Sequence, residues 1–294
     1  MSAVHLVRLP DLMKRGQGHP AIAVALIDGP VVLDHPDLAG STIHEIPGKL
    51  KGTCTRADSI ACTHGTFVAG MLAARRGSFA PAICPGCTLL LRPIFSETTK
   101  ENGQMPSATP EELAEAIIDS VDRGARIVNL SAALIRPSLK GESKLEEALN
   151  HAAHRGVITV AAAGNQGMVG SSAITRHPWV IPVAACDTQG KPLNESNLGR
   201  SIGRRGLSAP GVSVTSLGTN GKPQTFGGTS VAAPFVTGTI ALLWSEFPGA
   251  TATQVKLAVT QAGTPRHGTI APPVLDASAA YQTMASAHKG RKAS

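Results

Sequence analysis

Short apolar runs recur along the chain, and turn-forming or polar residues bound each of them. They cover residues 21–27, 88–94, 126–131, 157–163 and 180–185. A run that is apolar at successive positions, without alternation, predicts a strand that is buried on both faces. Such strands are typical of a parallel sheet, so we expect these runs to form one.

Amphipathic segments lie between these runs and predict helices. Thr109 suits an N-cap, Pro110 the first helical position and Glu112 the partner in a capping box. Apolar positions then recur at helical spacing up to Gly124, and residues 142–155 follow the same pattern. Alternating strands and helices predict an α/β fold, with a mostly parallel central sheet and helices on both faces. In such folds, ligands bind beyond the C-terminal ends of the strands.

Length and composition favour one large domain. The chain has 294 residues, 42% of them hydrophobic, and can bury a substantial core without cross-links. We expect residues 1–20 to form an N-terminal extension, 21–285 the domain, and 286–294 a basic, disordered tail.

Charge and aromatic content bear on the partners. The net charge is +7, but the Lys and Arg residues are spread along the sequence and concentrate only in the tail. Aromatic residues make up 3%, too few for the stacking platform that single-stranded nucleic acids need. We therefore expect a solvated basic surface and no nucleic-acid partner.

The first 20 residues contain no apolar run long enough for the core of a signal peptide. No segment approaches the length of a membrane span. We therefore expect a cytoplasmic protein that does not enter the membrane. The sequence does not indicate the oligomeric state.

Three polar residues stand where predicted elements begin or end. Asp28 follows the first apolar run, His64 opens an apolar helical segment, and Ser230 follows a glycine pair before another. Each has an ordinary structural interpretation: a turn residue, a surface histidine and a helix cap. Together they follow the order Asp, His, Ser, one of the chain orders in which a nucleophile, its base and the orienting carboxylate occur.

Asn165 is a further candidate, because it follows the run 157–163. An Asn at the end of a strand can be a plain turn residue. Its side-chain N–H can also stabilise an oxyanion.

The segments around these residues resemble, in the same order, the motifs of subtilisin-like serine proteases (subtilases). They are Ile27-Asp28-Gly29, His64-Gly65-Thr66-Phe67-Val68-Ala69-Gly70, Ala163-Gly164-Asn165 and Gly228-Thr229-Ser230-Val231-Ala232-Ala233-Pro234. Phe67 departs from the family pattern, which usually has His at that position. The resemblance implies a subtilisin-like three-layer sandwich and an endopeptidase activity.

The resemblance also implies the role of each residue. Asp28, His64 and Ser230 would form the catalytic triad, and Asn165 would form the oxyanion hole with the backbone N–H of Ser230. An extended peptide substrate would pair with the segment Ser131, Ala132 and Ala133. Ala163 and Gly164 would form the other wall of the first specificity pocket.

A narrower resemblance is to the cyanobactin-maturation proteases, which cut the leader from ribosomally made peptide precursors. The segments that carry it are Ile27-Asp28-Gly29-Pro30-Val31, Cys84-Pro85-Gly86-Cys87 and Arg92-Pro93-Ile94-Phe95. The interval between Asp28 and His64 is too short for the helical insert of macrocyclising relatives, which favours plain hydrolysis. A general intracellular protease and an inactive, peptide-binding pseudo-protease are the alternatives.

Many subtilases bind calcium, and Asp37 matches one of their ligands. The stretch Arg75-Arg76-Gly77-Ser78 lacks the oxygen ligands that Ca²⁺ needs. We expect no cofactor and no metal site.

Cys54 and Cys62 flank a short loop before His64, and Cys84 and Cys87 flank another. Reduced thiols, two disulfides and a zinc site are all compatible with these spacings. Cys186, in a strand candidate, is expected to be a buried, inert thiol.

Overall fold

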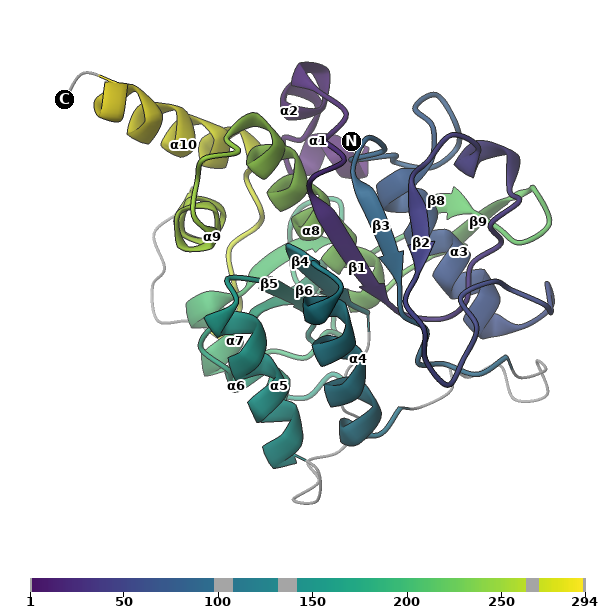
Figure 1. Cartoon of the computed structure of the whole chain (residues 1–294). Coiled ribbons are helices and arrows are strands. Elements are labelled where there is room, and N and C mark those ends of the chain that lie inside the picture. Colours follow the sequence, from purple (N-terminus) through teal and green to yellow (C-terminus); the bar gives the residue numbers. More distant parts are fainter. Residues whose placement is uncertain (1, 98–107, 132–141, 263–269, 293–294) are drawn as a thin grey trace.

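A seven-stranded parallel sheet forms the centre of the molecule (Figure 1). The computed structural model describes residues 2–97, 108–131, 142–262 and 270–292. In spatial order the strands are β2 (Ile43–Glu45), β3 (Thr88–Leu91), β1 (Ala23–Ile27), β4 (Ile127–Leu130), β5 (Ile158–Ala162), β6 (Ile181–Cys186) and β7 (Leu207–Pro210). The strands predicted from apolar runs are confirmed as β1, β3, β4, β5 and β6, and β2 and β7 add the two edges.

Helices cover both faces of the sheet. On one face lie α4 (Pro110–Asp122), α5 (Glu142–His154) and the short α6 (Ala173–Arg176), and on the other α3 (Ile60–Ala73) and α8 (Thr229–Glu246). Strand β1 shows how the sequence produces this arrangement. Val24 and Leu26 belong to the core that contains α3 and α8, whereas Ala25 and Ile27 belong to the core under α4 and α5. The predicted three-layer α/β fold is confirmed.

The helix boundaries follow local capping chemistry. The capping box of Thr109 and Glu112 is present at the start of α4, as predicted. Helix α3 begins earlier than expected, because the side chain of Ser59 caps it through the N–H of Cys62. His64 therefore lies in the second turn of α3, not at its start.

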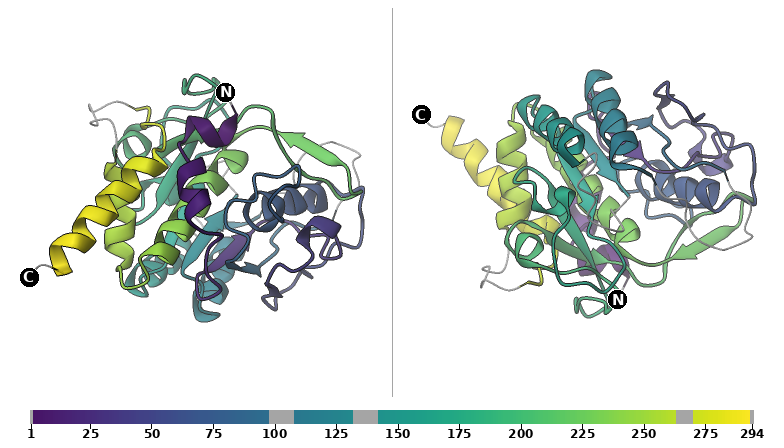
Figure 2. Two further views of the ribbon diagram at one scale, coloured as in Figure 1. Left: turned by 90° about the horizontal axis from the view of Figure 1, so that it is seen from above. Right: turned by 90° about the horizontal axis from the view of Figure 1, so that it is seen from below.

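A further group of helices forms an outer layer beside α8 (Figure 2). They are α1 (Ala3–Leu6), α2 (Pro10–Arg15), α9 (Ala252–Gln261) and α10 (Ala277–Lys292). Val7, Leu9 and Leu12 are buried in the main core, so the segment from Val7 to Leu12 packs into the domain. Helix α10 continues to Lys292, and the expected disorder of the tail is wrong for residues 286–292.

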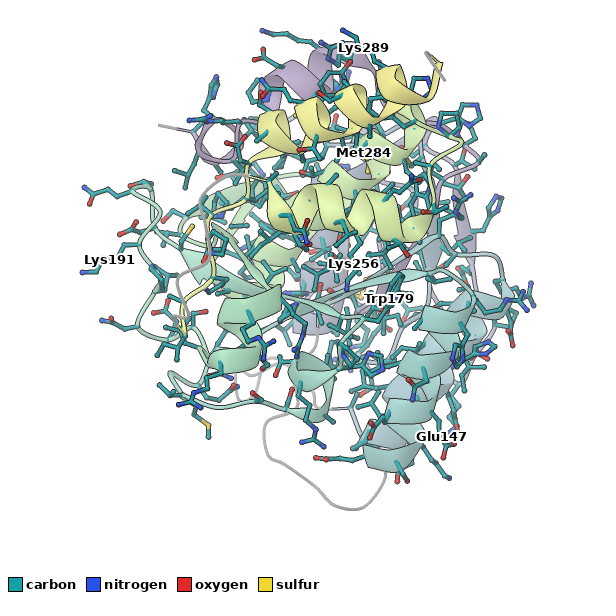
Figure 3. All side chains as sticks on the ribbon, turned by 90° about the vertical axis from the view of Figure 1, so that its left-hand side faces the viewer. Glu147, Trp179, Lys191, Lys256, Met284 and Lys289 are labelled. Carbon is teal, nitrogen blue, oxygen red and sulfur yellow. A yellow bond between two sulfur atoms is a disulfide. The ribbon has the colours of Figure 1, made fainter. Side chains whose placement is uncertain are left out.

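Figure 3 shows the side of the molecule formed by α9, α10 and α5. Lys256 of α9 lies over the ring of Trp179, with its ammonium 4.8 Å from the ring centroid. Burial lowers the pKa of Lys256, and the charge of Arg205 lowers it further. None of the described helices is long and apolar enough to cross a membrane.

An antiparallel hairpin precedes α8. It consists of β8 (Val214–Leu217) and β9 (Pro223–Phe226) and packs against α3. The short helices η1 (Pro36–Leu38) and α7 (Arg200–Arg205) complete the described elements. The hairpin brings the segment before Ser230 against the helix that carries His64.

Candidate active site

Asp28, His64 and Ser230 come together from three separate elements. Asp28 directly follows β1, His64 lies in α3 and Ser230 in the first turn of α8. Nδ1 of His64 is 2.7 Å from Oδ1 of Asp28, and Nε2 of His64 is 2.9 Å from Oγ of Ser230. Hydrogen bonds therefore link the three side chains in a continuous line.

Glycine allows α3 to approach the end of β1 closely enough for the first of these bonds. A Cβ atom at Gly65 would lie 2.4 Å from the carbonyl oxygens of both Gly29 and Pro30. Any side chain there would push the helix away from the strand end. Gly65 thus sets the distance between His64 and Asp28.

Asp28 and His64 form a buried pair. Asp28 is fully buried and His64 is 7% exposed. Oδ1 of Asp28 also accepts the backbone N–H of Gly29 at 2.7 Å. Burial pulls the pKa of His64 down, but the charge of Asp28 and its hydrogen bond outweigh burial, so the pKa is raised.

The backbone before Ser230 has a conformation that favours glycine. Gly228 is the N-cap of α8, with φ +101°, and a Cβ there would lie 2.8 Å from Nδ2 of Asn165. Ser230 is the second residue of the helix, where backbone N–H groups have no partner within the helix. This N–H is therefore available to an anionic oxygen at the helix N-terminus.

Thr229 fixes the amide orientation of Asn165, a role that was not predicted. Oδ1 of Asn165 accepts the backbone N–H of Thr229 at 2.8 Å and its hydroxyl at 3.0 Å. The same hydroxyl accepts the N–H of Gly164 at 3.1 Å. Since Oδ1 faces Thr229, the Nδ2 group remains as a donor beside Gly228. The threonine stood in a quoted motif, but only the fold reveals its partner.

The predicted substrate-binding residues are placed in part. Ala163 and Gly164 directly precede Asn165, and Asn197 holds them through bonds to both carbonyl oxygens. Ser131 follows β4, and its hydroxyl accepts Nδ2 of Asn129 at 2.9 Å. Ala132 and Ala133 lie outside the described residues, so their pairing with a peptide stays a prediction.

The residues around Asp37 do not fit a calcium ion. Oδ1 of Asp37 is 2.7 Å from Nε of Arg75, and the Arg75 N–H donates to the Asp37 carbonyl at 2.8 Å. The guanidinium of Arg75 thus occupies the place at this carboxylate that a calcium ion would need. That the chain works without a metal stays a prediction.

The cysteine pairs differ in state. Cys54 and Cys62 form a disulfide with Cα atoms 5.5 Å apart, whereas Cys84 and Cys87 are buried thiols. Glu97 lies beside the disulfide, but sulfur atoms bonded to each other offer no thiolate to a metal. Disulfides are rare in cytosolic proteins, so the cytoplasmic location stays a prediction that this bond does not favour.

Cys186 is a fully buried thiol, as predicted. Burial, reinforced by the charge of Asp187, raises its pKa to about 12. The thiol therefore stays protonated and unreactive at neutral pH.

Known proteins are similar to this chain in sequence and in fold. The model of the subtilase family matches residues 19–278. The thermostable alkaline protease of Halalkalibacterium halodurans is 34% identical over 202 residues, covering 68% of this chain and 52% of the relative. Subtilisin amylosacchariticus of Bacillus subtilis subsp. amylosacchariticus is 30% identical over 258 residues, covering 85% of this chain and 62% of the relative. The chain thus spans between about half and three fifths of the length of these curated relatives.

Solved structures agree over almost the whole length. A single-residue variant of the protease domain of PatA superposes with a TM-score of 0.83 at 31% identity, covering 92% of this chain and 97% of that one. The prenylagaramide maturation protease PagA superposes with a TM-score of 0.81 at 29% sequence identity. This match covers 94% of this chain and 98% of the PagA chain. The chain belongs to the subtilase family.

Proposed function

We propose that the chain is a serine endopeptidase in which Asp28, His64 and Ser230 form the catalytic triad. The observation that carries this proposal is the unbroken line of hydrogen bonds from Asp28 through His64 to Ser230. Membership of the subtilase family supports the same assignment of a serine endopeptidase. Because Nδ1–H of His64 donates to Asp28, Nε2 is the atom that accepts from the Ser230 hydroxyl.

The chemistry follows from this tautomer. Ser230 Oγ attacks the scissile carbonyl carbon while Nε2 of His64 takes its proton. The imidazolium then gives that proton to the leaving amine, and the C–N bond breaks. Water repeats the sequence on the acyl-enzyme and releases the carboxylic acid. Asp28 holds the imidazole in place and offsets its positive charge.

Two donors face the position of the developing oxyanion. They are Nδ2 of Asn165, oriented by Thr229, and the backbone N–H of Ser230 at the start of α8. Donors that are already oriented stabilise the charge of the tetrahedral intermediate without reorganisation. Asn165 and Ser230 are therefore the proposed oxyanion hole.

The proposed substrate is a ribosomally made natural-product precursor peptide, from which the enzyme removes the leader. The likeness to PatA and PagA, the latter named as a maturation protease, supports this class. Ala163 and Gly164 would border the first specificity pocket, where their small size leaves room for a substrate side chain. We infer hydrolysis as the reaction, and no cofactor.

Mass spectrometry tests the substrate class. The genes next to its own are searched for a short precursor peptide, the protein is incubated with that peptide, and Ser230→Ala serves as the inactive control. One defined cut between leader and core supports processing. Cuts at many sites, with casein digested at a comparable kcat/KM, would instead identify a general protease.

A further inference from the structure

Three aromatic rings meet where α3 contacts the β8–β9 hairpin. The ring of Phe226 lies 5.9 Å from that of His64 and 5.0 Å from that of Phe67, between centroids. The two phenyl rings are inclined by 61°, the edge-to-face arrangement that aromatic pairs favour. Phe67 is fully buried, and Phe226 is half-buried.

Both phenyl rings belong to the elements that carry the reacting groups. Phe67 lies one helical turn after His64 in α3, so their side chains share a helix face. Phe226 ends β9, just before the turn into α8 and Ser230. Ser216 of β8 also donates to the carbonyl of Phe67 at 2.8 Å, which fastens the hairpin to the helix.

We propose that Phe67 is a positioning residue that keeps the imidazole of His64 aligned with Ser230 through Phe226. The inference rests on the triad proposed above and goes beyond it. Phe67 does not meet the substrate, because no part of it is exposed, and its only aromatic contact among the described residues is with Phe226. It acts by supporting the ring that contacts His64.

Geometry explains the need for such support. Hydrogen bonds hold His64 at Nδ1 through Asp28 and at Nε2 through Ser230, but neither bond fixes the rotation of the ring about the line through these two nitrogens. Phe226 restricts this rotation by contacting the ring, and Phe67 restricts the movement of Phe226. A displacement of about 1 Å in catalytic geometry can cost on the order of a hundredfold in rate.

The departure of Phe67 from the family pattern fits this role. An apolar ring at this position completes an edge-to-face pair with Phe226 in the core cluster. If Phe67 served the core alone, its replacement would lower the free energy of unfolding and leave the kcat of the folded protein unchanged. The two roles therefore differ in a measurable quantity.

The test is the Phe67→Leu variant, which keeps an apolar side chain and removes the ring. At a temperature where the variant is fully folded, we expect kcat to fall by about ten- to a hundredfold, with KM unchanged. The far-downfield NMR signal of the Nδ1 proton of His64 should broaden as the ring loosens. Phe247→Leu is the control, because Phe247 makes an aromatic contact only with Tyr281 and His288 among the described residues, at 5.5 and 5.9 Å.

Variants at Phe226 keep the test decisive if Phe67→Leu does not fold. Phe226→Leu should also lower kcat and broaden the NMR signal, and Phe226→Tyr, which keeps a ring, should restore both. An unchanged kcat and NMR signal in folded Phe67→Leu, or an equal loss in Phe247→Leu, would overturn the inference. Failure of the triad itself would look different, because the unmodified protein would then be inactive.

Discussion

The proposed active site has two halves with opposite exposure. The half from β1 and α3 is closed, since Asp28 is fully buried and His64 is 7% exposed. The half from β5 and α8 is open, with Asn165 exposed and Ser230 half-buried. Groups that hold and move a proton are shielded from water, whereas groups that meet the substrate face solvent. The halves should therefore fail in different ways: changes in the closed half alter the pH dependence, and changes in the open half alter kcat alone.

Loss of the nucleophile should have the largest effect. Ser230→Ala removes the only atom that can form the acyl-enzyme, and we expect kcat to fall by about 10⁶, the magnitude found in subtilisin itself. His64→Ala combined with it should cost little more, because the two act as a unit. Measurement of kcat for the single and double variants on one peptide decides this. Additive losses would contradict the proposal that His64 and Ser230 act as one unit.

Asp28→Asn changes the closed half of the site, and we expect the change to shift the pH dependence of kcat/KM. We expect kcat to fall by about 10⁴, because the imidazole loses its orienting carboxylate. Activity needs neutral His64, so kcat/KM rises as pH passes through the pKa of that residue. Burial still lowers this pKa in the variant, but the charge of Asp28 no longer raises it, so the rise should move to lower pH. An unmoved profile would refute the assignment of the titration to His64.

Asn165→Ala tests the open half. We expect kcat to fall by about 10²–10³, the cost of one oxyanion donor in a subtilisin, with KM and the pH profile unchanged. Asn165 does not contact His64 in any of the described hydrogen bonds, so its loss should not shift the titration. A shifted profile would mean that the two halves are not separable.

Thr229→Val should weaken the same donor by a smaller amount. The variant loses the hydroxyl that orients Asn165, and we expect kcat to fall by about tenfold, the equivalent of one neutral hydrogen bond. Thr239→Val is the matched control, because Thr239 is a buried residue of α8 whose hydroxyl, within the described part of the chain, bonds only the Phe235 carbonyl of its own helix. Equal losses in both variants would show that the effect comes from the helix as a whole.

Treatment with a metal chelator should have the smallest effect on stability and activity. Because Arg75 occupies the Asp37 carboxylate, EDTA should leave both Tm and kcat unchanged. Arg75→Ala removes an ion pair whose arginine is 69% exposed, so it should lower the free energy of unfolding by at most about 1 kcal/mol. A fall of Tm on EDTA treatment, reversed by Ca²⁺, would reveal a site elsewhere in the chain.

Patterns of neighbouring residues in the sequence were enough to predict most of the fold and the residues at the centre of the proposed active site. Apolar runs predicted the central strands, and the side chains of Thr109 and Glu112 marked the start of α4 in the sequence. Asp28, His64 and Ser230 were identifiable because each lies in a motif read from neighbouring residues. The tail was misjudged from its basic charge, although Ala277, Ala280 and Met284 repeat at the spacing of a buried helix face.

Contacts between distant segments could not be predicted. The bond from Thr229 to Asn165 and the pair Asp37 and Arg75 each join residues whose proximity depends on the completed fold. The spacings left thiols, disulfides and zinc open for both cysteine pairs, yet only Cys54 and Cys62 are bonded, whereas Cys84 and Cys87 are free thiols. Spacing alone does not set the direction in which two sulfur atoms point.

Covalent labelling of Ser230 tests the central claim most directly. A fluorophosphonate reacts rapidly with a serine whose hydroxyl is activated by a neighbouring base. Mass spectrometry of the digested protein should place one adduct on Ser230, with labelling lost in His64→Ala and slowed in Asn165→Ala. A folded protein that takes up no label, with or without peptide present, would contradict the assignment of Asp28, His64 and Ser230 as a working triad.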